Sequence, residues 1–268
     1  MSGLRLVIVH RTAYAYSARA HSTVQSLRLS PRDEAHQRVL EWQIRAPGTL
    51  VAGRDAHGNL AHTLTHHVLH NEFVVEASGE VEVEALPGGR LADSRLGLPA
   101  LAYLASTPLT RAGEALREAS ARRLRRADAS GLLDWAEAVR ELVRYSPGAT
   151  HVGTRAEDAL ALGRGVCQDQ AQVFIAGCRA QRIPARYVSG YYASGNESRE
   201  AESHAWVDVW VGDAWLSLDV THGRLADSRL CRLAVGRDYD EAAPVRGVRA
   251  GGGQESMSVR VNIRATSF

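Results

Sequence analysis

The change in hydrophobic period along the chain constrains its fold more than any other feature. Over residues 4–84, apolar side chains alternate with polar ones in short runs separated by turn signals. Alternation at period two is typical of antiparallel strands with one buried face. Residues 86–99 are rich in Gly and Pro and are interpreted as a linker. We therefore predict a β-rich N-terminal domain over residues 1–95 and a second domain over residues 96–268.

Beyond residue 95 the period becomes that of α-helices. Apolar residues recur every three or four positions over residues 132–143, which predicts an amphipathic helix. A second helix is expected from Thr154, because Thr154 and Glu157 fit a capping box and Gly163 fits a left-handed C-terminal cap. A third should begin near Cys167 and end before an Ile-Pro dipeptide.

Alternation at period two returns after the third predicted helix. It is found in residues 185–192, 204–211, 214–220 and 257–263. We assign all four runs to one sheet of the second domain. Helices followed by strands favour an α+β fold, with the helices packed on one side of an antiparallel sheet.

Composition excludes several classes of protein. The 268 residues are 45% apolar and 23% charged with a net charge of +2, as in soluble globular proteins. No apolar run approaches the ~20 residues that cross a bilayer, so we expect no membrane partner. The arginine-rich residues 122–126 are interpreted as a solvated helix face, and no nucleic-acid partner is expected. Three cysteines and a start without an apolar signal-peptide region favour the cytoplasm.

One cysteine stands where a nucleophile would. A thiol reacts as its thiolate, and the pKa of a cysteine falls when the thiol lies at a helix N-terminus beside a histidine. Cys167 opens the third predicted helix directly after the glycine-containing residues 163–166. Cys178 and Cys231 are better explained as small buried residues.

A histidine and a carboxylate are expected to lie close together on two neighbouring strands. His204 begins an alternating run that ends at a plausible two-residue hairpin turn, residues 212–213. Val211 then pairs with Ala214, and this register makes His204 and Asp219 diagonal neighbours on one face. Such neighbours are roughly 7 to 8 Å apart between backbones, within reach of an imidazole and a carboxylate.

The three residues together have the arrangement of a catalytic triad. Asp208 is the poorer partner, because four residues of strand place it roughly 13 Å from His204. In the predicted site, Asp219 orients His204, and the charged imidazole favours the thiolate of Cys167. This thiolate would attack a carboxamide or peptide carbonyl and form a thioester, which an amine or water would resolve.

The motifs GVCQD, SHAWV and D-x-T-H-G, with the strand-rich N-terminal region, resemble the bacterial transglutaminase-like family over nearly the whole chain. The resemblance implies a papain-like core preceded by a β-sandwich-like region. It also implies a nucleophile at Cys167, a base at His204 and an orienting carboxylate at Asp219. A protein or peptide substrate is expected, with no cofactor and no metal.

Other interpretations stay open at this point. A cysteine peptidase or amidase would use the same triad, and a binding module could retain it without catalysis. Cys167, His204 and Asp219 could also bind a metal ion. A second metal site is conceivable among clustered histidines, but neighbours on one strand face would be roughly 13 Å apart. These histidines are His57, His62, His66, His67 and His70.

The segment GRLADSRL occurs twice, at residues 89–96 and 223–230. The sequences that flank the two copies differ. We therefore predict no structural repeat.

Overall fold

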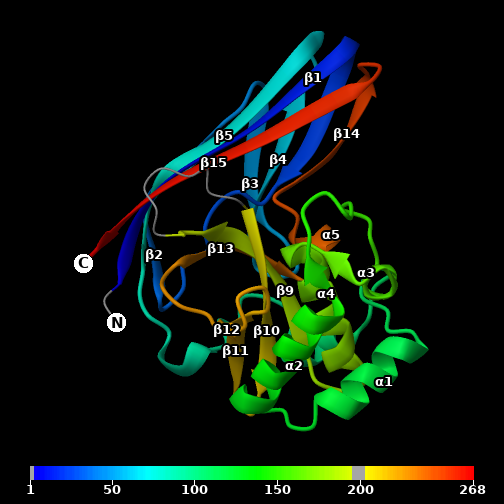
Figure 1. The fold of residues 1–268 in the computed structure, drawn as a ribbon. Coiled ribbons are helices and arrows are strands. Elements are labelled where there is room, and N and C mark those ends of the chain that lie inside the picture. The colour runs from blue at the N-terminus through cyan, green and yellow to red at the C-terminus, as the bar shows by residue number, and fades with distance from the viewer. Residues whose placement is uncertain (1–2, 195–202) are drawn as a thin grey trace.

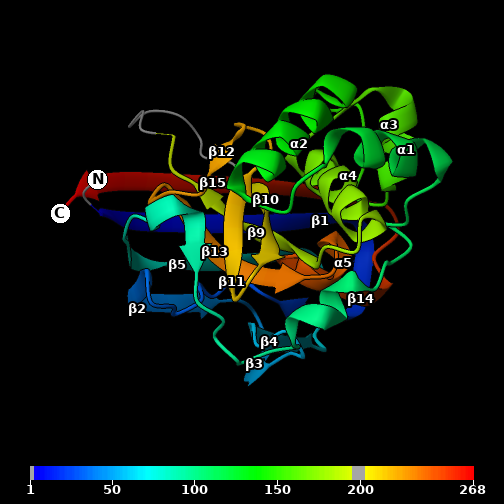
Figure 2. The same cartoon turned by 90° about the horizontal axis from the view of Figure 1, so that it is seen from below.

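The structure, a computed structural model, describes residues 3–194 and 203–268. It has a sheet of long strands and, beside it, a second sheet covered by helices (Figure 1). Figure 2 shows the longer helices gathered on one side of the second sheet. The predicted α+β architecture, with a β-rich N-terminal region and helices packed on an antiparallel sheet, is confirmed.

The first sheet has seven strands in the described part of the chain. They are β1 (Leu4–Leu27), β2 (Gln37–Arg45), β3 (Thr49–Arg54), β4 (Leu60–His66), β5 (His70–Val83), β14 (Val245–Gly251) and β15 (Glu255–Ser267). β1 is the spine of this sheet. Its first part lies between β5 and β15, and its last part lies between β4 and β14.

The second sheet has six strands and carries the helical layer. Its strands are β6 (Arg90–Leu91), β9 (Ala185–Tyr192), β10 (Ser203–Val211), β11 (Ala214–Asp219), β12 (Arg224–Leu225) and β13 (Leu230–Gly236). The helices are α1 (Glu114–Arg123), α2 (Ala129–Leu142), α3 (Ala156–Leu162), α4 (Cys167–Ala180) and α5 (Tyr239–Ala242). Two short 3-10 helices flank β6 in sequence, η1 (Pro87–Gly89) before it and η2 (Ala100–Leu104) after it. β7 (Arg144–Tyr145) pairs in parallel with β8 (Arg164–Gly165).

The C-terminal strand belongs to the first sheet. β15 pairs antiparallel with β1 along its length, from Leu4 opposite Ser267. The assignment of residues 257–263 to the second sheet is therefore wrong. Alternation identifies a strand but not its partner, and here Val261 packs in a cluster with Ile8 of β1. Sheet membership thus crosses the predicted boundary near residue 95, and that boundary stays a prediction.

The helical layer is held by close contact between α2 and α4. Trp135 of α2 is fully buried, and its indole N–H donates to the carbonyl of Phe174 at 3.1 Å. A Cβ at Gly177 would lie 2.3 Å from the Trp135 ring, so only glycine allows this approach. α4 is therefore fixed against the helical core, with its first residue at the edge of that core.

The three predicted helices are present as α2, α3 and α4. Gly163 ends α3 with φ of 68°, as predicted for a left-handed cap. The predicted capping box is wrong, because the N-cap is Arg155 and the Thr154 hydroxyl instead accepts from the amide of His151 at 3.0 Å. In the described chain, no helix has the length and apolar character to span a bilayer.

The two copies of GRLADSRL pair with the same strand. Each begins with a glycine in the left-handed region, Gly89 with φ of 69° and Gly223 with φ of 62°. The Arg-Leu pair that follows forms a two-residue strand, β6 or β12, and both strands run antiparallel to β11. The similarity is thus local, and it covers two successive stretches of β11.

Candidate active site

The motif GVCQD builds the tip of α4. Asp169 folds back so that one carboxylate oxygen accepts from the amide of Val166 at 2.7 Å and from the hydroxyl of Thr150 at 2.6 Å. A Cβ at Gly165 would lie 2.6 Å from that oxygen, so glycine makes room for the turn. Cys167, the first residue of α4, is half-buried at the N-terminus of the helix, where backbone amides have no intrahelical acceptor.

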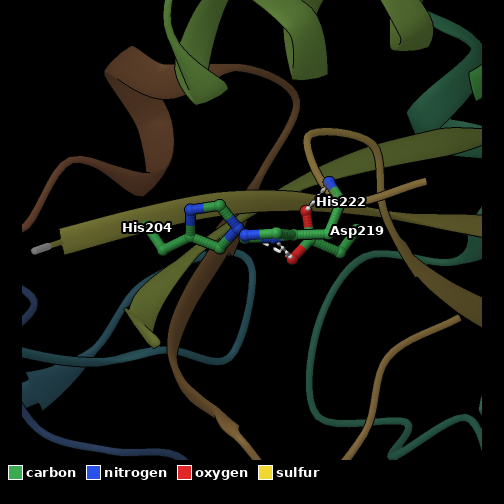
Figure 3. A group of neighbouring side chains, drawn as sticks. All are labelled: His204, Asp219 and His222. Atoms are coloured by element: carbon green, nitrogen blue, oxygen red, sulfur yellow. Dashed lines mark hydrogen bonds and ion pairs between the residues drawn. The ribbon is translucent and has the colours of Figure 1, made fainter. Parts of the chain in front are cut away.

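The hairpin of β10 and β11 has the register expected from its turn. Val211 pairs with Ala214, and Gly212 has φ of 67°. The imidazole of His204 lies with Nε2 2.9 Å from Oδ2 of Asp219 (Figure 3). Asp219 is fully buried, and the His204 side chain is only 8% exposed. The structure thus brings these two predicted site residues into direct contact.

Cys167 and His204 line the same cavity. The Cys167 side chain also acts on the imidazole, because it raises the pKa of His204. Because Nε2 is occupied by Asp219, Nδ1 is the nitrogen left for the sulfur. Burial lowers the pKa of His204, but hydrogen bonds with Asp219 and Cys167, and the charges of both groups, outweigh it and raise that pKa to about 10. The imidazole is therefore a cation at neutral pH.

The Asp219 carboxylate is held in its ionised form by the histidines around it. Burial raises the pKa of this carboxyl, yet hydrogen bonds from His204 and His222 outweigh burial and hold the pKa well below its usual range. The site is thus built around a fixed buried negative charge. That charge compensates the imidazolium beside it.

His222 is a site residue that the sequence analysis missed. Its Nδ1 lies 2.7 Å from Oδ2 of Asp219, and its backbone amide donates to Oδ1 at 3.2 Å. The His222 ring centroid is 5.4 Å from that of His204, so two imidazoles share one carboxylate oxygen (Figure 3). The histidine in D-x-T-H-G was the available signal, since it follows Asp219 by three residues.

Gln170 connects the nucleophile helix to the loop that follows Asp219. Its amide oxygen accepts from the hydroxyl of Thr221 at 2.8 Å, and its amide nitrogen donates to the carbonyl of Val143 at 2.8 Å. Gln170 is buried. It therefore positions α4 and β11 relative to each other.

The remaining sequence candidates have structural roles. Asp208 forms buried ion pairs with Arg186 at 2.8 Å and Arg232 at 2.6 Å, which explains why it is not the partner of His204. Cys178 and Cys231 are fully buried, and burial raises the pKa of both thiols. All three cysteines are free.

The clustered histidines are spread over several elements. β4 ends at His66 and β5 begins at His70, so the expected single strand is wrong. His57 is buried between the Tyr103 hydroxyl at 2.9 Å and Glu241 at 3.0 Å. In the described chain, one group of three donors could hold a metal ion, and it consists of His204, Asp219 and His222. Their nitrogens already bond to the carboxylate.

A cavity of about 480 Å³ opens beside Cys167. Its walls come from both sheets. The core contributes Cys167, Gln168 and His204, and the first sheet contributes residues of β1 and β15. A substrate carbonyl can therefore approach the sulfur from a space between the two sheets.

Two family models match the chain. The Transglutaminase-like superfamily matches residues 118–220, and the Bacterial transglutaminase-like N-terminal region matches residues 6–82. The chain belongs to the bacterial transglutaminase-like family. The first match contains Cys167, His204 and Asp219, and the second covers most of β1 to β5.

Proteins of other organisms are similar to this chain over most of their length. An uncharacterised protein of Mycobacterium leprae is 30% identical over 97% of this chain and 98% of its own. An uncharacterised protein of Mycobacterium tuberculosis is 29% identical over 91% of this chain and 87% of its own. The solved structure of a proposed cysteine protease from Cytophaga hutchinsonii superposes with a TM-score of 0.78 at 21% identity, covering 100% of this chain and 91% of the other. The transglutaminase-like fold, with its papain-like core, therefore extends over both regions.

Proposed function

We propose that the protein is a cysteine acyltransferase or amide hydrolase that forms a thioester at Cys167. The observation that carries the proposal is the 2.9 Å contact between His204 and the buried Asp219, in a cavity wall that His204 shares with Cys167. A nucleophile, a base and an orienting carboxylate within hydrogen-bond reach are the parts that acyl transfer requires.

The chemistry follows from the charges of these groups. The Cys167 thiolate attacks the carbonyl carbon of a carboxamide or peptide, and a C–S bond forms. In this proposal, the backbone amide of Cys167, the first residue of α4, donates to the developing oxyanion. His204 then gives its proton to the leaving nitrogen, and ammonia or an amine departs. The thioester is resolved by an amine or water, whose proton returns to His204.

The amine of a transfer reaction must come from another molecule if it is a lysine amine. The chain contains no lysine, because all 32 residues in the Lys plus Arg count are arginine. It therefore carries no side-chain ε-amine of its own. Purified protein incubated alone should therefore form no lysine-linked oligomers. When a lysine-containing acceptor and a glutamine peptide are both added to the protein, the acceptor should become linked to the peptide.

A direct test uses a glutamine peptide and a labelled primary amine. Wild-type protein should release ammonia and attach the label to the peptide, whereas Cys167→Ala should do neither. Cys178→Ala is the matched control, because Cys178 lies on the same helix but is sealed in the core. Equal labelling by wild type and Cys167→Ala would contradict the proposal. Ammonia release without labelling would identify the hydrolase.

Peptide cleavage is the second candidate function. It is favoured by the cavity between the sheets, and by the name of the Cytophaga hutchinsonii protein with the same fold. Release of new peptide amino termini by wild type, absent in Cys167→Ala, would identify a peptidase. If Cys167 reacts with neither substrate, a binding module that retains the three residues becomes the better account.

We propose a reducing compartment such as the cytoplasm, in keeping with three free thiols.

A further inference from the structure

The cavity beside Cys167 has one wall that belongs to the N-terminal sheet. This wall consists of residues of β1 and β15 with the first residue of β14, and it faces the tip of α4 and the first residues of β10. In both views β15 passes the N-terminal end of β10, which carries His204 (Figures 1 and 2). The chain's C-terminal strand is therefore part of the space next to the nucleophile.

The inner face of β15 is apolar, but the core covers only part of it. Met257, Val259, Val261 and Ile263 follow at period two, so they share one face. Val261 is 2% exposed and packs in a cluster formed by residues of both sheets, whereas Val259 is 45% and Met257 is 58% exposed. The exposed side chains of Met257 and Val259 both line the cavity that contains Cys167. An apolar surface thus lies open where a substrate would pass.

Among the described residues, β15 also has a free edge. One edge pairs with β1, and the described residues contribute no strand to the other edge. A free strand edge offers N–H and C=O groups that an extended peptide can bind by adding a further strand. The pairing would place alternate side chains of the peptide on the inner face, toward the core.

We infer that the acyl donor is an extended peptide that adds to the free edge of β15, with an apolar side chain against Met257 and Val259. This inference rests on the proposed function, because it assigns the substrate for that same nucleophile. The reactive carboxamide side chain points inward to Cys167. Since residues two apart share a face, the apolar residue lies two positions from the reactive one. The adjacent residues point away from the cavity and contribute little to selectivity.

The test uses peptide electrophiles, so that it does not depend on turnover. A chloromethyl ketone replaces the glutamine carboxamide, and the Cys167 sulfur forms a C–S bond as chloride leaves. Four peptides carry leucine or serine either two positions or one position from this group. Leucine two positions away should accelerate inactivation about ten-fold over serine, the usual discrimination of an apolar pocket. Leucine one position away should have no such effect.

Variants locate the effect on β15. Val259→Thr and Met257→Gln keep the shape of the side chains but make them polar, and they should bring the leucine-to-serine ratio close to one. Val248→Thr is the matched control, because Val248 is 74% exposed on β14 and does not line the cavity. This control should retain the wild-type ratio. Iodoacetamide should alkylate Cys167 at the same rate in all these proteins, since it needs no peptide contacts.

The outcomes separate this inference from the proposed function. Iodoacetamide could modify Cys167 while the leucine and serine peptides inactivate the protein at equal rates, whichever position the residue occupies. That result would overturn the peptide site on β15 but leave Cys167 as the proposed nucleophile. A ratio that survives in Val259→Thr and Met257→Gln also overturns it. If Cys167 reacts with no reagent, both proposals fail.

Discussion

His204 and Asp219 lie on adjacent strands, with Nε2 of the imidazole 2.9 Å from Oδ2 of the buried carboxylate. The carboxylate holds the Nε2 side of the ring and stabilises its positive charge, which leaves Nδ1 free to face Cys167. The imidazole of His204 is therefore oriented by a buried carboxylate.

Asp219→Asn should remove most of the activity while the fold is kept. The amide has nearly the same shape, but it lacks the charge that stabilises the imidazolium and can hold the wrong tautomer. The expected loss in kcat is roughly 10³- to 10⁴-fold, as in other triads. Asp213→Asn serves as the control, because Asp213 is 91% exposed in the hairpin turn. A similar loss in both variants would contradict the assigned role.

His222 should act as a positioning residue. His222→Ala removes one hydrogen bond to Asp219 and should lower kcat about ten-fold, the equivalent of one such bond, with KM little changed. His222→Asn retains a donor at the position of Nδ1 and should restore most of the rate. Equal activity of wild type and His222→Ala would show that the shared carboxylate does not need its second histidine.

The stability of the protein should depend on pH through His204. The folded-state pKa of His204 is about 10, above its ordinary value of 6.5, so the folded state binds the proton more tightly. The resulting stabilisation is fully present below pH 6.5 and is lost as the pH rises through about 10. The difference in unfolding free energy between wild type and His204→Gln should therefore shrink between these values.

Urea unfolding at several pH values measures this difference. It should decrease by at least about 1.4 kcal/mol, the equivalent of one pKa unit. A difference that stays constant up to pH 10 would show that the imidazole is not held as a cation.

Gly177→Ala tests the contact that fixes α4. A Cβ at this position would meet the Trp135 ring at 2.3 Å. We expect destabilisation of about 1 to 3 kcal/mol, because the core must shift to accept one methyl group. Gly53→Ala is the control, since its nearest neighbour would be 4.0 Å away. Urea midpoints that move equally in both variants would contradict the packing argument.

The part of the site that could be predicted from sequence depends on local geometry. A two-residue turn fixes the register of β10 and β11, and the register alone places His204 near Asp219. The period of the apolar residues likewise fixes the helix that begins at Cys167. In both cases the deciding interactions lie within a few residues along the chain.

The rest depended on contacts between distant segments. β15 alternates like any strand, and its pairing with β1 joins opposite ends of the chain, so its period could not reveal its partner. Thr154 fits a capping box in sequence, but the Thr154 hydroxyl accepts a hydrogen bond from the amide of His151, and α3 starts later, with Arg155 as its N-cap. The role of His222 required the path of the loop after Asp219.

The most direct test is mass spectrometry of acid-quenched protein after brief exposure to a glutamine peptide. The account predicts an adduct on Cys167 equal to the peptide less one ammonia, lost on treatment with hydroxylamine and absent in Cys167→Ala. Turnover of the peptide with no adduct on Cys167, or with the same adduct on Cys167→Ala, would contradict it.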